Sequence, residues 1–364
     1  MSVLQAGHKI IVIGASAGGL EAIKGLVSKL PRHFNSPIFI VWHMGPGTTG
    51  ILPQVINNLN TVPAVHAVDK EPIEPGKIYI APPDRHLLIE KDRVRVTHGP
   101  RENRFRPAVD PLFRSAAYAY GARVAGIVLS GALDDGTAGL WTIKRRGGMA
   151  IVQEPADAAY ASMPTNALEA VNIDFQLPIA EIAQLLIKLD NGLSYKINTT
   201  MPDPDEQEDN RTKMEISVGL QENTSDASIL ELGEISPYTC PECHGVLVAI
   251  NEGRRTRFRC HTGHAFSADS LLLNLTESIE KSLWSAVRGL EETVFLLNNM
   301  GDQFSSHNNP KLAAAYFRKA KETEARADKV RAVIKQHELL STENTGTVSV
   351  NQALAVNKKN NHPA

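Results

Sequence analysis

The turn at residues 14–19 constrains the fold of this chain more than any other feature. The short apolar run His8–Ile13 precedes it, as expected of a buried parallel strand. Gly19–Leu30 follows, with apolar side chains at helical spacing up to Pro31. The turn Gly-Ala-Ser-Ala-Gly-Gly therefore joins a strand directly to a helix, and it places Ser16 at the carboxyl edge of a sheet.

Strands and helices continue to alternate up to about residue 190. This pattern predicts an α/β fold with a doubly wound, mostly parallel sheet in a first domain, residues 1–190. A content of 42% hydrophobic residues is enough for a sizeable core. The expected elements are buried strands at 37–42, 77–81, 123–129 and 149–153, a β-hairpin at 86–97, and helices at 110–120, 137–146 and 178–189.

The glycine-rich turn has two possible functions. It could bind phosphate at the start of a helix, or it could expose Ser16 as a nucleophile. A dinucleotide site is expected to carry an acidic residue about 20 positions further on, but the sequence has none between Glu21 and Asp69. A P-loop Lys-Ser/Thr pair is also missing. The nucleophile is therefore favoured over a nucleotide site.

A serine nucleophile needs a base and a group that orients the base. His43 ends the second predicted strand, and Asp134 and Asp135 follow the strand at 123–129. All these positions belong to the carboxyl edge, so Ser16, His43 and Asp135 are expected to converge there. As alternatives, the histidine could be an ordinary loop residue, and an aspartate could cap the helix that follows.

Further motifs extend this pattern beyond the three candidate catalytic residues. In order along the chain they are Ile11–Gly19, Val41–Met44, Ile80–His86, Asn103–Pro107 with Val109–Phe113, and Ser130–Gly136. In this order they resemble the catalytic domain of the chemotaxis protein-glutamate methylesterases, the CheB family, over about residues 8–190. Because the first strand begins at residue 8, we expect a stand-alone form without a receiver domain.

The resemblance implies a function and a catalytic triad. Ser16 matches the nucleophile, His43 the general base and Asp135 the aspartate that orients it. The implied activity is hydrolysis of glutamate methyl esters in the cytoplasmic domain of chemotaxis-type receptors, without a cofactor, in chemosensory adaptation. Deamidation of glutamine by the same route is a possible second activity.

The resemblance also suggests residues around the triad. The backbone near Ala17 and Ala132 is expected to form an oxyanion hole. The family's usual Gly-Met-Gly reads Gly131–Leu133 here, and an alanine replaces the usual threonine after the serine. Arg104 and Arg106 are candidates for substrate binding, with surface arginines on a loop as the alternative.

Residues 191–234 differ in composition from the first domain. Acidic residues dominate, and only Lys196, Arg211 and Lys213 oppose them. Aromatic residues are nearly absent. We predict an acidic, flexible linker.

All three cysteines lie in residues 235–266. An odd number in one short segment argues against a disulfide framework. Cys240, Cys243, Cys260 and His264 have the spacing of a structural zinc site, which predicts a zinc-ribbon-like module. His261 is the alternative fourth ligand, and a redox C-x-x-C pair is the alternative function.

Residues 267–340 are expected to form a helical hairpin that binds an unidentified signalling partner, followed by a disordered tail at 341–364. A catalytically weak adaptor that relies on this region is the alternative function of the chain. The formal net charge of -2 gives no indication of nucleic-acid binding. No apolar run is long enough for membrane insertion, so a cytoplasmic location is expected.

Overall fold

A computed structural model describes residues 8–43, 50–193, 205–222, 229–252 and 255–340. Two compact units make up the chain, Met1–Leu271 and Leu272–Ala364. The predicted disordered tail at 341–364 lies outside the described residues, as do parts of the predicted linker.

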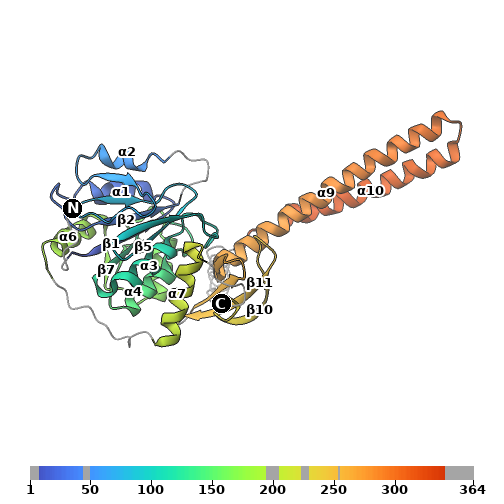
Figure 1. Ribbon diagram of the computed structural model, residues 1–364. Helices are drawn as coiled ribbons and strands as arrows, with labels where there is room; N and C mark the ends of the chain where they lie inside the picture. Colours follow the sequence, from blue (N-terminus) through green and yellow to red (C-terminus); the bar gives the residue numbers. More distant parts are fainter. Residues whose placement is uncertain (1–7, 44–49, 194–204, 223–228, 253–254, 341–364) are drawn as a thin grey trace, which may run out of the picture. The chain divides into compact units, whose positions relative to one another are not determined.

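A seven-stranded parallel sheet forms the centre of the first unit, in the order β3-β4-β2-β1-β7-β8-β9 (Figure 1). Its strands are β1 (Ile10–Ala15), β2 (Ile38–Trp42), β3 (Ala64–His66), β4 (Ile78–Ile80), β7 (Val124–Val128), β8 (Met149–Gln153) and β9 (Phe175–Leu177). The chain reverses its winding direction at β1, which lies between β2 and β7. The predicted doubly wound α/β fold is confirmed.

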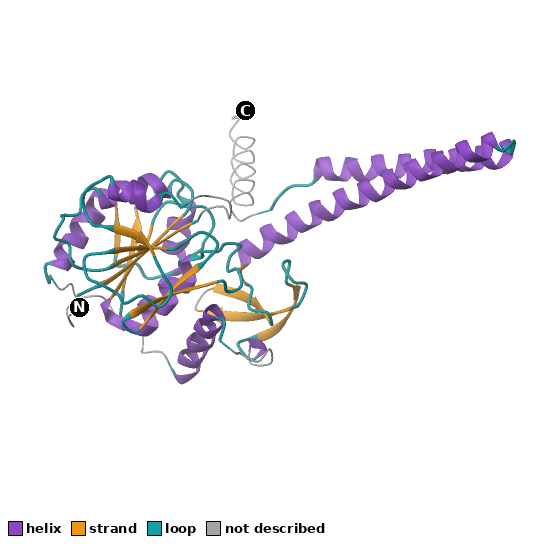
Figure 2. Ribbon diagram, turned by 45° about the horizontal axis from the view of Figure 1, so that its top comes forward, coloured by secondary structure: helices purple, strands orange, loops and turns teal. Residues whose placement is uncertain are grey.

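Helices cover both faces of the sheet (Figure 2). Side chains alternate along β1, so Ile11 and Ile13 enter one apolar cluster, while Ile10 and Val12 enter the other. The first cluster is closed by α1 (Gly19–Val27), α2 (Leu52–Asn57) and α6 (Ile179–Asp190), and the second by α3 (Val109–Tyr120), α4 (Thr137–Arg145) and α5 (Ser162–Ala170). Burial on both faces explains why the strands read as unbroken apolar runs.

The predicted β-hairpin is present as β5 (His86–Glu90) and β6 (Arg93–Thr97), which pair antiparallel. The hairpin packs on α3, where the Ser115 hydroxyl accepts a hydrogen bond from the Ile89 amide at 3.0 Å. The elements α2, β3, α5 and β9 were not predicted, because they are short or lack a clear apolar period.

The structure departs from the predicted flexible linker at α7 (Glu206–Leu220). The Asp205 side chain caps this helix by accepting a hydrogen bond from the Glu208 amide at 2.8 Å. Glu215 is only 2% exposed, and it contacts arginines that are distant in the sequence. Acidic composition suggested a solvated spacer, but the acids on one face of this helix bind cations of the folded unit.

A small antiparallel sheet follows, in the order β10-β11-β12-β13. We call residues 229–271 the C-terminal module, because Ile229 and Leu232 share an apolar cluster with this sheet. Val218 of α7 belongs to the same cluster. The strands are β10 (Glu234–Thr239), β11 (Val246–Glu252), β12 (Arg255–Cys260) and β13 (Ala265–Ser267).

The second unit contains two long helices, most of α9 (Ala268–Ser306) and α10 (Pro310–Gln336), which lie side by side (Figure 1). The Phe304 and Tyr316 rings stack at 5.3 Å, and Arg331 pairs with Glu291. This is the helical hairpin that the apolar spacing predicted. Among the described helices, none combines the length and the hydropathy needed to span a membrane.

Candidate active site

Three side chains meet at the carboxyl edge of the sheet, where the neighbouring strands β2, β1 and β7 end. His43 Nδ1 lies 3.1 Å from Ser16 Oγ, and His43 Nε2 lies 2.8 Å from Asp135 Oδ2. In the tautomer protonated at Nε2, the imidazole donates to Asp135 and turns the lone pair of Nδ1 toward the serine hydroxyl. The structure thus brings together the three residues that the sequence singled out.

The backbone fixes Ser16 tightly between its neighbours. Its amide donates to the Ser130 carbonyl at 2.9 Å, and its carbonyl accepts from Trp42 Nε1 at 3.0 Å. Glycine is required at one position in the turn of the serine and at one position in the neighbouring turn. Gly18 has φ +70°, and a Cβ at Gly131 would lie 2.9 Å from the Ser16 Cβ.

Asp135 is 1% exposed and accepts several hydrogen bonds besides that from His43. Its Oδ2 accepts from the Val109 amide at 2.7 Å, and its Oδ1 accepts from Asn103 Nδ2 and the Gly136 amide at 3.0 Å each. Burial opposes ionisation, but the hydrogen bond and charge of His43 and the other donors outweigh it and lower the pKa of Asp135. The carboxylate is therefore suited to hold a protonated imidazole.

A second buried acid, Asp110, lies behind Asp135. Its carboxyl accepts from the Gly139 amide at 2.7 Å and from Asn103 Nδ2 at 2.9 Å. Burial, followed by the negative charge of Asp135, raises the pKa of Asp110 to about 8. The pKa values of the two adjacent acids are thus shifted in opposite directions, lowered for Asp135 and raised for Asp110.

Asp134, the neighbour of the triad aspartate, has a different role from the one considered in the sequence. No side chain caps α4, whose N-cap is Gly136, so the helix-cap alternative is wrong for Asp134. Its carboxyl accepts instead from Ser267 Oγ at 2.7 Å and from Arg255 Nη1 at 2.9 Å. Burial raises the pKa of Asp134 to about 6. This aspartate connects the catalytic edge to the C-terminal module.

Phe105 covers the imidazole of His43. The two rings stack at a centroid distance of 3.7 Å with an angle of 10° between their planes, and the His43 side chain is 3% exposed. The roles of Phe105 and Asn103 were not predicted, although both lie in the motif Asn103–Pro107. Nothing in the sequence places that motif next to His43.

The two arginines of the same motif lie apart from the triad hydrogen bonds. Arg106 Nε donates to Asp84 Oδ1 at 2.9 Å, and Arg106 Nη1 donates to the Gly99 carbonyl at 2.9 Å. Arg104 is partly buried and has φ +77°. These contacts give Arg106 a part in fixing its own loop, and substrate binding by either arginine stays a prediction.

Ala17 follows Ser16 in the chain, and Ala132 follows Gly131, where an added Cβ would lie 2.9 Å from the Ser16 Cβ. Ser130 Oγ donates to the Ala17 carbonyl at 2.8 Å, and the Met163 amide donates to the Gly131 carbonyl at 2.9 Å, so both turns are held by hydrogen bonds. Within the described residues, the amides of Ala17 and Ala132 have no hydrogen-bond acceptor. Two such amides next to a serine can donate to a developing oxyanion.

Cys240, Cys243, Cys260 and His264 form a cluster whose ligand atoms all lie within 4.8 Å of one another. Cys243 Sγ lies 3.6 Å from Cys260 Sγ, and His264 Nδ1 lies 3.7 Å from Cys240 Sγ. Such distances fit the edges of a tetrahedron with metal–ligand bonds of about 2.0–2.3 Å. His261, the alternative ligand, is not in this cluster, and the set of donors could hold a metal ion.

Comparison with known proteins finds relatives of part of this chain. A model of the family described as CheB methylesterase matches residues 11–186. A Leptospira interrogans protein named "Putative protein-glutamate methylesterase/protein-glutamine glutaminase" is 42% identical over 186 residues, which cover 51% of this chain and 96% of that protein. A Yersinia pestis protein-glutamate methylesterase/protein-glutamine glutaminase is 36% identical over 200 residues, which cover 53% of this chain and 57% of that protein.

Among solved structures, the CheB methylesterase catalytic domain of Thermotoga maritima matches with 33% identity and a TM-score of 0.48, covering 50% of this chain and 98% of that one. The Leptospira relative is matched over nearly its whole length. The first domain of this chain therefore belongs to the CheB methylesterase family.

Proposed function

We propose that the chain is a serine hydrolase that removes methyl groups from glutamate methyl esters of chemotaxis-type receptors. The observation that carries this proposal is the continuous hydrogen-bonded path from Ser16 through His43 to Asp135. Relatives of the first domain are named protein-glutamate methylesterases. We assign the activity to chemosensory adaptation and the enzyme to the cytoplasm, because the substrate that we propose is the cytoplasmic domain of a receptor.

In the first half of the reaction, Ser16 Oγ attacks the ester carbonyl while His43 Nδ1 accepts the hydroxyl proton. The imidazolium that forms keeps its Nε2–H on Asp135, and the lowered pKa of that carboxyl keeps the negative charge in place. The tetrahedral intermediate then collapses, and the departing methoxide takes the proton from His43 and leaves as methanol.

In the second half, water attacks the acyl-enzyme on Ser16, with His43 again as the base, and glutamate is released. The amides of Ala17 and Ala132 are the donors that we assign to the oxyanion, because each lies in a turn next to Ser16 and each lacks an acceptor among the described residues. One such donor contributes about 3 kcal/mol to transition-state stabilisation. No step requires a cofactor.

A glutamine side chain can follow the same path with ammonia as the leaving group, which makes deamidation the second activity that we assign to the site. The relatives carry glutaminase in their names as well. Arg104 and Arg106 lie in the loop that carries Phe105, and we assign them to contacts with the receptor around the ester.

Methanol release from a methylated receptor fragment tests the proposal. We expect the Ser16→Ala variant to lose activity by a factor of at least about 10⁴, as serine hydrolases do when a triad member is removed. Arg32→Ala, on the far side of the sheet from the triad, is the matched control and should keep wild-type rates. Undiminished release by Ser16→Ala would contradict the proposed mechanism.

For the C-terminal module we propose a structural zinc ion bound by Cys240, Cys243, Cys260 and His264. Four protein ligands leave no open position, so the ion would stabilise the fold of the module and would not take part in the reaction. Metal analysis of the purified full-length chain should find about one zinc per chain in the wild type, and Cys243→Ser should lower this content.

A further inference from the structure

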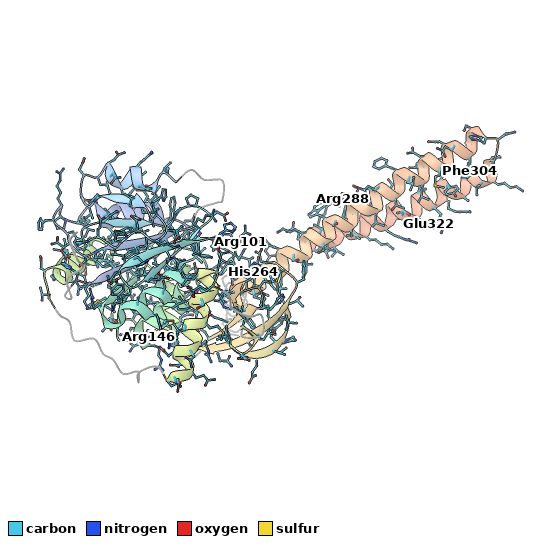
Figure 3. The ribbon with its side chains drawn as sticks, viewed as in Figure 1. Arg101, Arg146, His264, Arg288, Phe304 and Glu322 are labelled. Carbon is cyan, nitrogen blue, oxygen red and sulfur yellow. The ribbon has the colours of Figure 1, made fainter. Side chains whose placement is uncertain are left out.

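Residues 101–103 of the first domain run alongside strand β13 of the C-terminal module. The Asn103 amide donates to the Ala265 carbonyl at 2.8 Å, and the Ala265 amide donates to the Arg101 carbonyl at 3.2 Å. Glu102 and Ala265 form a parallel β-bridge. Figure 3 labels Arg101 and His264, which mark the two sides of this contact. The module thus adds backbone hydrogen bonds to the segment that leads into the active site.

The side chain of Asn103 connects this contact to the triad. It is 5% exposed, and its Nδ2 donates to Asp135 at 3.0 Å and to Asp110 at 2.9 Å. Its Oδ1 accepts from the Ser267 amide at 2.9 Å and from Ser270 Oγ at 3.3 Å. Because a backbone N–H faces one end of the amide and two carboxyls face the other, only one orientation of the side chain satisfies all partners.

A buried group of ions holds the preceding residue, Glu102. Its carboxylate pairs with Arg114 of α3 at 3.1 Å and with Arg259 of the module at 2.8 Å. Glu215 of α7 joins both arginines. The charges of Arg114 and Arg259 outweigh the cost of burial and lower the pKa of Glu102. Residue 102 is therefore fixed between the two domains.

The same segment also carries the ring that stacks on the catalytic base. The Phe105 amide donates to the Glu102 carbonyl at 2.9 Å, which closes a turn over residues 102–105. Fixing Glu102 therefore also fixes Phe105 against His43. The module has a connection to two triad members, through Asn103 to Asp135 and through Phe105 to His43.

We propose that the C-terminal module positions the catalytic triad, and that Asn103 is the positioning residue through which it acts on Asp135. This inference rests on the proposed function. The module presents the Ser267 amide to Asn103 Oδ1, and this contact directs Nδ2 toward Asp135. When the module is displaced, the amide loses the donors that select its orientation, and Asp135 loses one of its hydrogen bonds.

The first test is steady-state kinetics of Asn103→Ala in the full-length chain with the methylated receptor fragment. A hydrogen bond to a charged group that is lost in this way corresponds to a decrease in kcat of about 10- to 100-fold. KM should stay within about 3-fold of the wild-type value, because the Asn103 side chain is buried behind Asp135. Ser270→Ala removes only the weaker donor, so it should lower kcat by a few-fold at most.

The second test asks whether the module acts through Asn103. Cys243→Ser perturbs the module at a distance from the triad, and it should lower kcat in the wild-type background. In the Asn103→Ala background it should lower kcat by a smaller factor than in the wild-type background, because both changes interrupt the connection to Asp135 and only the connection through Phe105 is left to lose. Arg211→Ala is the matched control. Its guanidinium donates to the exposed Asn251 carbonyl of the module at 3.2 Å, and kcat should not change.

Circular dichroism of each variant separates loss of positioning from loss of folding, and Ser270→Ala serves as the mildest variant. Wild-type kcat in a folded Asn103→Ala protein would overturn the inference, as would fully additive losses in the double variant. Both results leave the proposed function intact. A wild-type chain that releases no methanol would overturn the proposed function and this inference with it.

Discussion

The parallel sheet and the junction between the first domain and the C-terminal module are held together by different forces. The sheet buries aliphatic side chains on both faces, such as Ile13 and Ile127 on one and Val12 and Val128 on the other. The junction buries charges instead, with Glu215 between Arg257 and Arg259, all at most 5% exposed. Apolar packing tolerates small shifts between elements, whereas ion pairs of this kind require defined positions.

This difference matches what each region contributes to the site. The sheet places the backbone of Ser16, His43 and Asp135 at one edge, which needs only the order of the strands. The junction instead orients side chains around the triad, chiefly Asn103 and Phe105. The apolar core therefore determines where the triad lies, while the buried charges determine how closely its members are aligned.

The largest effect is expected when the ionic junction loses its central carboxylate. Glu215→Gln leaves Arg114, Arg257 and Arg259 close together without that charge, and we expect a local destabilisation of about 3–5 kcal/mol. Hydrogen exchange should become faster in the module while the central strands remain protected. Equal deprotection of both regions would break the comparison.

Glu208→Gln is the matched control on the same helix. Glu208 pairs with Arg145 near the surface, where ion pairs contribute about 0–1 kcal/mol. Little change in module exchange is expected.

Shortening a buried side chain of the sheet should destabilise the first domain rather than the module. Ile127 is fully buried in β7, and Ile127→Ala should lower the free energy of unfolding of the first domain by about 2–5 kcal/mol through lost burial and a cavity. Denaturant unfolding followed by tryptophan fluorescence measures this change. The kcat of the folded fraction should remain close to the wild-type value, and a loss of kcat as large as that of Asn103→Ala would contradict the proposed division of roles.

The smallest expected effect is the dependence of the junction's stability on pH. Burial raises the pKa of Glu215, but the charges of Arg114, Arg257 and Arg259 outweigh it and hold the pKa well below 4.5. The native state therefore binds fewer protons than the unfolded state. The resulting stability is fully present above the unfolded value near 4.5, and it is lost as pH falls through the lower folded value.

Acid should therefore loosen the junction before the apolar sheet. Asp110 has the opposite effect, because its pKa is raised to about 8. Its contribution to the free energy of unfolding therefore falls as pH rises from about 4 toward 8. Hydrogen exchange between pH 7 and pH 3 checks the junction. Loss of protection at the same pH in the sheet and in the module would show that the buried charges do not make the junction more sensitive to acid than the sheet.

Local patterns were sufficient to predict the central strands of the sheet and the three residues at its edge. Buried strands read as apolar runs, and each polar candidate follows the end of a strand, as His43 follows β2. Contacts between distant segments were not predictable in this way. Glu215 binds arginines more than 40 residues away, and a run of acids in the sequence cannot indicate such partners. Asn103 likewise acquires its role from Ser267, which lies 164 residues further on.

The central claim is that His43 activates Ser16 at the edge of the sheet. Covalent labelling by a sulfonyl fluoride, with the modified peptide identified by mass spectrometry, tests it most directly. We predict modification at Ser16 in the wild type and a labelling rate lowered by at least about 100-fold in His43→Ala, because an unactivated serine is a poor nucleophile. Labelling of Ser16 at the same rate in both proteins, or no labelling of Ser16 in the wild type, would contradict the account.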